Sequence, residues 1–161
     1  MRTTKDLSAD RQGFTLIECL IVVAIMTTVA AGGLLLSMDS YRGYSFRNDR
    51  DSLISLLQHA RAQAIGNVCL GDVCMAGADH GVAIKTDRYV LFQGSSYATR
   101  DVEQDIVVPS SPNSDKVGLE EVVFSALSGD PLQTGEISLM DVSVQGSIIT
   151  IGDEGQITWT H

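Results

Sequence analysis

The stretch Gln12-Gly-Phe-Thr-Leu-Ile-Glu-Cys-Leu-Ile-Val-Val23 places one acidic residue, Glu18, inside an otherwise apolar run. The run extends over Phe14–Leu36, 23 residues without Lys, Arg or Asp. A helix rising about 1.5 Å per residue would make it roughly 34 Å long, enough to cross a bilayer. A carboxylate inside such a span costs about 2.5–3.5 kcal/mol on insertion scales, so Glu18 is expected to meet a positively charged partner. The stretch therefore predicts a membrane-anchored N-terminal helix with a functional carboxylate.

A polar segment, residues 1–13, precedes this run and ends in Gly13. A secretory signal peptide has the opposite order, because its cleavage site follows the apolar segment. Cleavage after Gly13 would remove the polar leader and keep the helix. The leader charges Arg2, Lys5 and Arg11 favour a cytoplasmic N-terminus and hence an exported C-terminal domain. The alternative is an uncleaved signal anchor that happens to contain a Glu.

The segment Gly13-Phe-Thr-Leu-Ile-Glu18, followed by the apolar run to Leu36, closely resembles the N-terminal signature of the type IV prepilin family. The resemblance implies cleavage after Gly13 by a membrane-embedded prepilin peptidase, followed by N-methylation of Phe14. It also implies that Glu18 meets the α-amino group of a neighbouring subunit's first residue, which suits a buried carboxylate. The implied partners are the peptidase, other pilin or pseudopilin subunits and the cytoplasmic membrane.

Charge is strongly unbalanced along the chain. The whole sequence carries 11 basic and 20 acidic residues, a net charge of −9. Without the leader, which holds three basic and two acidic residues, eight and eighteen remain, a net charge of −10. No Lys or Arg follows Lys116, whereas seven acidic residues do. An acidic C-terminal half repels phosphate backbones, so DNA is not an expected partner.

Apolar residues recur with helical spacing beyond the predicted membrane span. Phe46, Leu53 and Ala60 are seven residues apart, and Leu57 and Ala64 repeat the spacing, which predicts an amphipathic helix that continues to about Ile65. Gly66-Asn67 suits a left-handed cap that ends it. The predicted organisation is a leader, the transmembrane half of a helix, its amphipathic half and an exported β-rich domain, over residues 1–13, 14–36, 37–66 and 67–161.

Short apolar runs separated by turn residues follow the helix, and they predict strands. A Ser/Pro/Asn-rich stretch, Pro109–Asp115, predicts a loop, residues 142–151 predict a hairpin, and Asp153-Glu154-Gly155 predicts a turn. A helix followed only by strands is an α+β fold, here with antiparallel sheet packed on the outer half of a long helix. The predicted strands are residues 68–70, 73–75, 82–86, 89–93, 106–108, 122–126, 137–144, 148–151 and 157–159.

This layout resembles one branch of the type IV pilin-like family, the GspH/FimT-type minor pilins and pseudopilins. The resemblance implies a structural subunit of a type IV pilus or of a type II secretion pseudopilus. The alternative within the family is a DNA-uptake receptor, but members that bind DNA use basic residues near the C-terminus, and here Gln156 follows Gly155. The segments that carry the resemblance are residues 53–65, 81–84, 89–92, 124–129 and 148–157.

Cys69 and Cys74 flank Leu70-Gly-Asp-Val73, in which Gly71-Asp72 suits a two-residue hairpin loop. Such a hairpin would place the two cysteines directly opposite each other, with Cα atoms about 4.5 Å apart, within the range of a disulfide. An exported domain lies in a compartment where the bond persists. The alternative is a metal site of Cys69, Cys74 and His80, but three ligands with this spacing match no established zinc pattern.

The remaining cysteine, histidine and acidic residues are not predicted to form a site. Cys19 lies in the predicted membrane helix and is expected to act as a small apolar residue. His59 and His161 are expected to be solvated, and adjacent residues such as Glu120-Glu121 point to opposite faces of a strand. No nucleophile elbow, phosphate loop or dinucleotide fingerprint is present. The expectation is a protein without a cofactor that is not an enzyme; a membrane-anchored exported enzyme is the remaining alternative.

Overall fold

The structure, a computed structural model, describes residues 15–71, 76–112, 114–141 and 146–160, without the side chains of residues 33–40 and 42. The chain divides into two compact units, Met1–Tyr41 and Arg42–His161. Helix α1 runs over Leu16–Ile65, so the predicted long N-terminal helix is confirmed from Leu16 onward.

The predicted end of this helix is also confirmed. Gly66 N–H donates to the Ala62 carbonyl oxygen at 2.9 Å, and Val68 N–H donates to the Gln63 carbonyl oxygen at 3.0 Å. Asn67 takes the left-handed conformation, with φ 50°. Asn tolerates this conformation better than most residues, and the reversal of the chain satisfies carbonyl groups that the helix leaves open.

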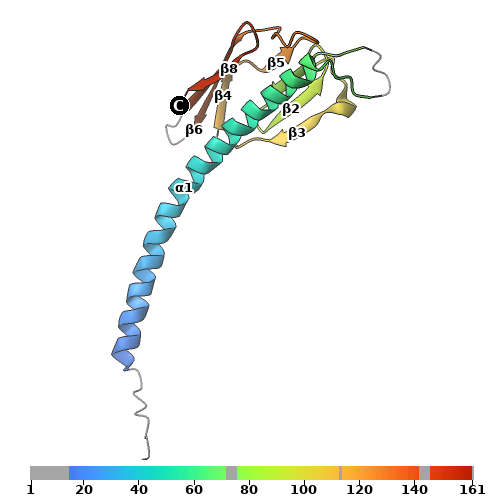
Figure 1. The fold of residues 1–161 in the computed structure, drawn as a ribbon. Helices are drawn as coiled ribbons and strands as arrows, with labels where there is room; N and C mark the ends of the chain where they lie inside the picture. The colour runs from blue at the N-terminus through green and yellow to red at the C-terminus, as the bar shows by residue number, and fades with distance from the viewer. Residues whose placement is uncertain (1–14, 72–75, 113, 142–145, 161) are drawn as a thin grey trace, which may run out of the picture. The chain divides into compact units, whose positions relative to one another are not determined.

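The second unit holds two four-stranded sheets, in which all neighbouring strands are antiparallel (Figure 1). We call them sheet A, with strand order β3-β2-β1-β5, and sheet B, with order β4-β6-β7-β8. The α+β class is confirmed. The elements are β1 His80–Ile84, β2 Arg88–Gln93, the 3-10 helix η1 Val102–Gln104, β3 Ile106–Pro109, β4 Ser114–Gly118, β5 Glu121–Phe124, β6 Gly135–Asp141, β7 Gly146–Ile151 and β8 Ile157–Thr160.

One hydrophobic core joins α1 to both sheets. The predicted stripe of α1 is buried, with Leu53, Leu57, Ala60 and Ala64 each 0% exposed. It packs against strands of sheet A and sheet B, and Figure 1 shows this part of α1 lying across both. The side chains that the strands contribute are Val82, Ile84, Tyr89, Leu91, Val122 and Phe124 from sheet A, and Ile137, Leu139, Ile149 and Ile151 from sheet B.

The other face of sheet A is covered as well. Ala83, Val90, Phe92 and Val123 form a second, smaller core there, and Tyr97 packs against it. The Tyr97 and Phe92 rings meet edge to face, with centroids 5.8 Å apart. Because both faces are covered, every residue of β1 is buried.

Two sequence predictions were wrong. Residues 68–70 form no strand, and β4 lies partly inside the predicted loop Pro109–Asp115. The sequence of β4 looks like a loop for two reasons. Turn-forming residues come immediately before Ser114, and the strand contains only one large apolar residue, Val117. The predicted strand 73–75 and residues 142–145 of the predicted hairpin lie outside the described residues, but β6 and β7 do pair, with Met140 opposite Gly146.

Candidate functional site

The N-terminal segment holds the processing residues predicted from the sequence. Gly13 and Phe14 lie outside the described residues. Thr15 precedes α1, and its hydroxyl oxygen accepts the Glu18 N–H at 3.3 Å. Thr15 and Glu18 thus have the Thr-x-x-Glu spacing of a capping box at the start of the helix. The polar residues of the motif therefore also help to define where α1 begins.

Beyond this cap, the described helical surface of the first unit is apolar and exposed. An exposed apolar surface of this extent marks contact with a membrane or with protein partners. Within the described residues, no helix has the length and apolar character that crossing a membrane requires. The exposed large apolar side chains of this surface are Leu16, Ile17, Leu20, Ile21, Val22, Val23, Ile25, Met26 and Val29.

Glu18 lies on this apolar surface, next to Cys19, Val22 and Val23. In the described part of the chain, its carboxylate has no ion-pair partner. An unpaired carboxylate is costly in an apolar environment, so burial of this surface would require a cationic partner for Glu18.

A comparison with known protein families finds a match at the N-terminal segment. Residues 8–34 match the prokaryotic N-terminal methylation motif. This motif supports a type IV pilin-like precursor. It implies processing by prepilin peptidase and assembly with other pilins, and it suggests inner-membrane anchoring before assembly. No curated protein and no solved structure matches the chain.

Two buried polar side chains of sheet A hold Val68 and Leu70, which flank Cys69. His80 and Gln93 lie opposite each other on β1 and β2 and are 1% and 7% exposed. The His80 Nε2 atom lies 3.0 Å from the Val68 carbonyl oxygen. The Gln93 side chain accepts the Leu70 N–H at 2.7 Å and donates to the Leu70 carbonyl oxygen at 3.0 Å. Gln93 thus provides the two hydrogen bonds that a neighbouring strand would have made.

Cys69 lies between these two anchored residues and is disulfide-bonded. Cys74 lies outside the described residues, so its pairing with Cys69 stays a prediction. Cys19, on the first unit, is a free thiol. The alternative metal site also includes Cys74, and His80 already contacts a backbone carbonyl through Nε2. Among the described residues, no three side chains of His, Cys, Asp or Glu are grouped to hold a metal ion.

The predicted disulfide has a direct chemical test. In a Cys19→Ser background, the folded chain is expected to show no thiol that reacts with iodoacetamide until reductant is added, and two thiols afterwards. The hydrogen bonds to Val68 and Leu70 fix the chain on both sides of Cys69, so the bond is expected to re-form when the reductant is removed. Mass spectrometry of tryptic peptides measures both steps, and labelling of Cys69 and Cys74 in the untreated chain would contradict the pairing.

The three longest segments of the family resemblance meet at Arg61 on α1. Its Nε atom donates to the Gly129 carbonyl oxygen at 3.3 Å, and its Nη2 atom donates to the Glu154 carbonyl oxygen at 2.7 Å. Gly129 follows β5 of sheet A, and Glu154 lies in the β7–β8 turn of sheet B. One side chain thus ties the helix to the ends of both sheets. We call these contacts the Arg61 clasp.

Gln156, two residues after Glu154 of the Arg61 clasp, makes a hydrogen bond within its own turn. Its side-chain oxygen accepts the Glu154 N–H at 3.1 Å, inside the β7–β8 turn. Position 156 therefore holds an uncharged amide that bonds to the turn itself. The turn Asp153–Gly155 predicted from the sequence is confirmed.

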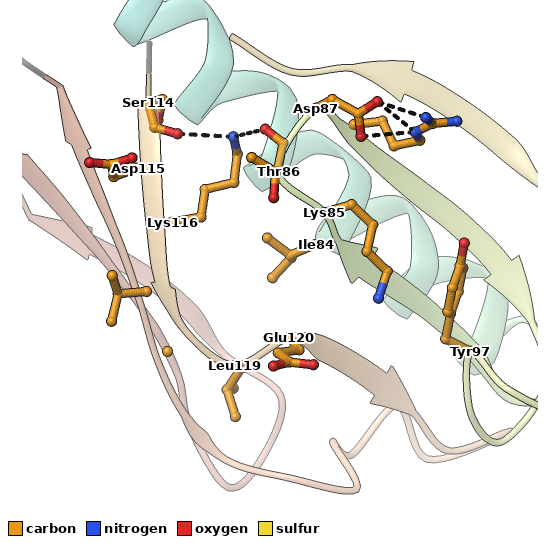
Figure 2. A pocket seen from close by; sticks show the side chains of 13 residues that line it. Ile84, Lys85, Thr86, Asp87, Tyr97, Ser114, Asp115, Lys116, Leu119 and Glu120 are labelled. Atoms are coloured by element: carbon orange, nitrogen blue, oxygen red, sulfur yellow. Dashed lines mark hydrogen bonds and ion pairs between the residues drawn. The ribbon is translucent and has the colours of Figure 1, made fainter. Parts of the chain in front are cut away.

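A cleft of about 800 Å³ opens between the β1–β2 turn of sheet A and strand β4 of sheet B (Figure 2). Lys116 crosses one end of it, because its Nζ atom donates to the carbonyl oxygens of Thr86 and Ser114, at 3.1 Å in each case. Partial burial lowers the pKa of the Lys116 ammonium, while the nearby carboxylates of Asp49, Asp115 and Asp87 act in the opposite direction. No local sequence pattern predicts this cleft, because its walls come from separate sheets.

Asp49, a buried carboxylate on α1, makes hydrogen bonds to segments next to the cleft. Asp49 is 3% exposed and accepts the Tyr89 hydroxyl at 3.1 Å and the Ser111 N–H at 3.0 Å. Burial, together with Asp49, raises the pKa of the Tyr89 phenol, which therefore stays protonated and donates. Asp49 thus fixes the loop before β4 and, through Tyr89, one strand of sheet A.

The other acidic and histidine residues considered from the sequence have separate surroundings. Glu121 accepts the Tyr97 N–H at 2.8 Å and so holds the loop that covers sheet A. Glu120 is exposed and lines the cleft, and His59 is exposed on α1. His161 lies outside the described residues.

Proposed function

We propose that the protein is a minor pilin or pseudopilin, a structural subunit that is cleaved after Gly13, methylated at Phe14 and assembled into a filament through its N-terminal helix. The observation that carries the proposal is the N-terminal methylation motif over residues 8–34, which includes an unpaired Glu18 on an exposed apolar helix. Before assembly, Phe14–Leu36 would hold the chain in the cytoplasmic membrane with the second unit exported.

Within this family we favour the GspH/FimT-type branch. The supporting observation is the Arg61 clasp, where the helix end, the segment that ends in Gly129 and the β7–β8 turn come together. These are three of the segments on which the resemblance depends. The three segments therefore resemble the branch at positions that contact one another: one supplies the Arg61 guanidinium and the other two supply the carbonyl groups that it binds.

We infer a structural role rather than a catalytic or DNA-binding one. Arg61 uses its guanidinium to hold backbone carbonyls, and Arg88 and Arg100 pair with Asp87 at 2.6 Å and with Asp105 at 2.8 Å. These cations are thus engaged within the domain rather than arranged as a phosphate-binding surface. The net charge of −10 after cleavage also opposes binding to DNA.

The processing step has a decisive test. In cells with an active prepilin peptidase, the mature chain is expected to begin at N-methylated Phe14, because cleavage after Gly13 keeps the apolar helix and removes the leader. Mass spectrometry of membrane and sheared-filament fractions measures the terminus. The matched control is a Gly13→Leu variant, which should keep residues 1–13, since the small residue at the cleavage site is lost. An intact Met1 terminus in the unaltered chain would refute the proposal.

A further inference from the structure

Strand β4 has an open side. It is an edge of sheet B, paired only with β6. Leu119 N–H donates to the Glu136 carbonyl oxygen at 3.2 Å. Because inward and outward backbone groups alternate along an antiparallel pair, Val117 faces β6, whereas the N–H and C=O groups of Lys116 and Gly118 face away from it. In the described part of the chain, these outward groups have no hydrogen-bond partner on another strand.

The open side of β4 borders the cleft described above. Its volume of about 800 Å³ lies within the usual range of about 300–1,000 Å³ for ligand sites. Figure 2 shows the ribbon of β4 on one side, Lys85 and Tyr97 opposite it, and Leu119 and Glu120 below. The Lys116 ammonium, bonded to Thr86, closes the remaining end. A free strand edge therefore runs along a space of the size that a ligand needs.

The wall opposite β4 is held in place before anything binds. The Tyr97 ring lies between two cations, with Lys85 Nζ 4.5 Å and Arg100 Cζ 3.7 Å from its centroid. Its backbone N–H donates to Glu121, and Arg100 pairs with Asp105 at 2.8 Å. A wall that is fixed in this way loses little conformational freedom on binding.

Three charged side chains that line the cleft have no hydrogen bond or ion pair within the described residues: Lys85, Asp115 and Glu120. The Lys85 ammonium contacts the Tyr97 ring but no carboxylate, and the Glu120 carboxylate has neither a hydrogen bond nor an ion pair. A simple anion would be attracted by the Lys85 ammonium but repelled by the Glu120 carboxylate. A simple cation would be attracted by Glu120 but repelled by Lys85. Because unpaired groups of both signs line the cleft, they favour a ligand that carries both charges.

We propose that this cleft binds an extended peptide segment of a protein partner, which adds a strand to the open side of β4. The segment presents an acidic side chain to Lys85 and a basic side chain to Glu120. In an extended peptide, residues two apart share a face, so one short segment can place both charges on the same side. Backbone hydrogen bonds to Lys116 and Gly118 supply affinity, and the two charges supply specificity.

The test uses the isotopically labelled full chain in detergent micelles and the capped peptides Thr-Glu-Val-Lys-Thr and Thr-Lys-Val-Glu-Thr, which cover both strand directions. Binding of one of them is expected to slow amide hydrogen exchange at Lys116 and Gly118 by about tenfold or more, as measured by NMR. A version with an N-methylated Val removes a backbone donor and should bind more weakly. Unchanged exchange at both amides at millimolar concentrations of both peptides would overturn the proposal.

Charge specificity is tested by separate variants. Lys85→Gln and Glu120→Gln are each expected to weaken binding of the charged peptide about two- to fivefold, and to leave binding of a peptide with Gln at both charged positions unchanged. Glu103→Gln, an exposed carboxylate outside the cleft, is the matched control and should have no effect. Equal affinities of all three variants for the charged peptide would refute the roles of Lys85 and Glu120.

Discussion

Glu18→Val is expected to be cleaved and to accumulate in the membrane at least as well as the unaltered chain, but to enter filaments at least about tenfold less. Removing the carboxylate lifts an insertion cost of about 2.5–3.5 kcal/mol, so membrane insertion should improve. Under the proposed function, the same change leaves a neighbouring terminal ammonium unpaired among apolar side chains, which costs about 3–5 kcal/mol. Immunoblots of membrane and sheared-filament fractions, with mass spectrometry of the N-terminus, measure the three steps separately.

Cys19→Val is the matched control for this experiment. It changes the adjacent residue on the same exposed turn of α1 without changing charge, and it should enter filaments normally. Filament incorporation of Glu18→Val equal to that of Cys19→Val would show that Glu18 is not an assembly group. A subunit at a filament tip has one neighbour fewer, which reduces the size of the defect without abolishing it.

Gly155→Ala is expected to destabilise the second unit by about 2–4 kcal/mol. Gly155 has φ 73°, a conformation that favours glycine. A Cβ atom there would overlap the Gly129 carbonyl oxygen and lie 2.8 Å from Arg61 Nε. The new methyl group therefore disrupts the Arg61 clasp at its centre. The free energy of unfolding, measured by urea titration of the full chain in micelles with the fluorescence of the single Trp, Trp159, reports the loss.

Gly146→Ala is the control for adding a methyl group at a glycine that has no positive φ. At this position an added Cβ has only the Leu139 carbonyl oxygen in reach, at 3.8 Å, which is an ordinary contact. The two variants make the same chemical change, one at the start of β7 and one in the β7–β8 turn, and only Gly155→Ala should lower the urea midpoint. Equal midpoints would show that the clasp contributes nothing to stability.

The elements that were predicted correctly are those in which one periodic pattern decides the packing. The seven-residue spacing of Phe46, Leu53 and Ala60 placed the helix stripe in the core, and all three are buried. The alternation in β7 likewise gave a strand with Ile149 and Ile151 inward. Such patterns are local, so they can be recognised without knowledge of the partner that covers them.

The predictions failed where a distant side chain decided the local structure. Leu70 looked like part of a strand, but its backbone hydrogen bonds go to the Gln93 side chain, 23 residues away. The strand β4 looked like a loop because its pairing with β6 depends on residues such as Leu139 and Ile137 rather than on its own composition. The Arg61 clasp and the cleft could not be predicted for the same reason. Each is formed by segments that are far apart in the sequence and come together only in the folded chain.

The path of the chain through the two sheets has a consequence for the cooperativity of unfolding. After β3 of sheet A, the chain enters sheet B at β4, returns to sheet A at β5 and finishes in sheet B from β6 onward. No single cut separates one complete sheet from the other, and the helix supplies core residues to both. Neither sheet is therefore an autonomous folding unit. A cut in the segment between β5 and β6 would leave sheet B without its edge strand, and the domain should melt as one two-state body rather than as two layers in succession.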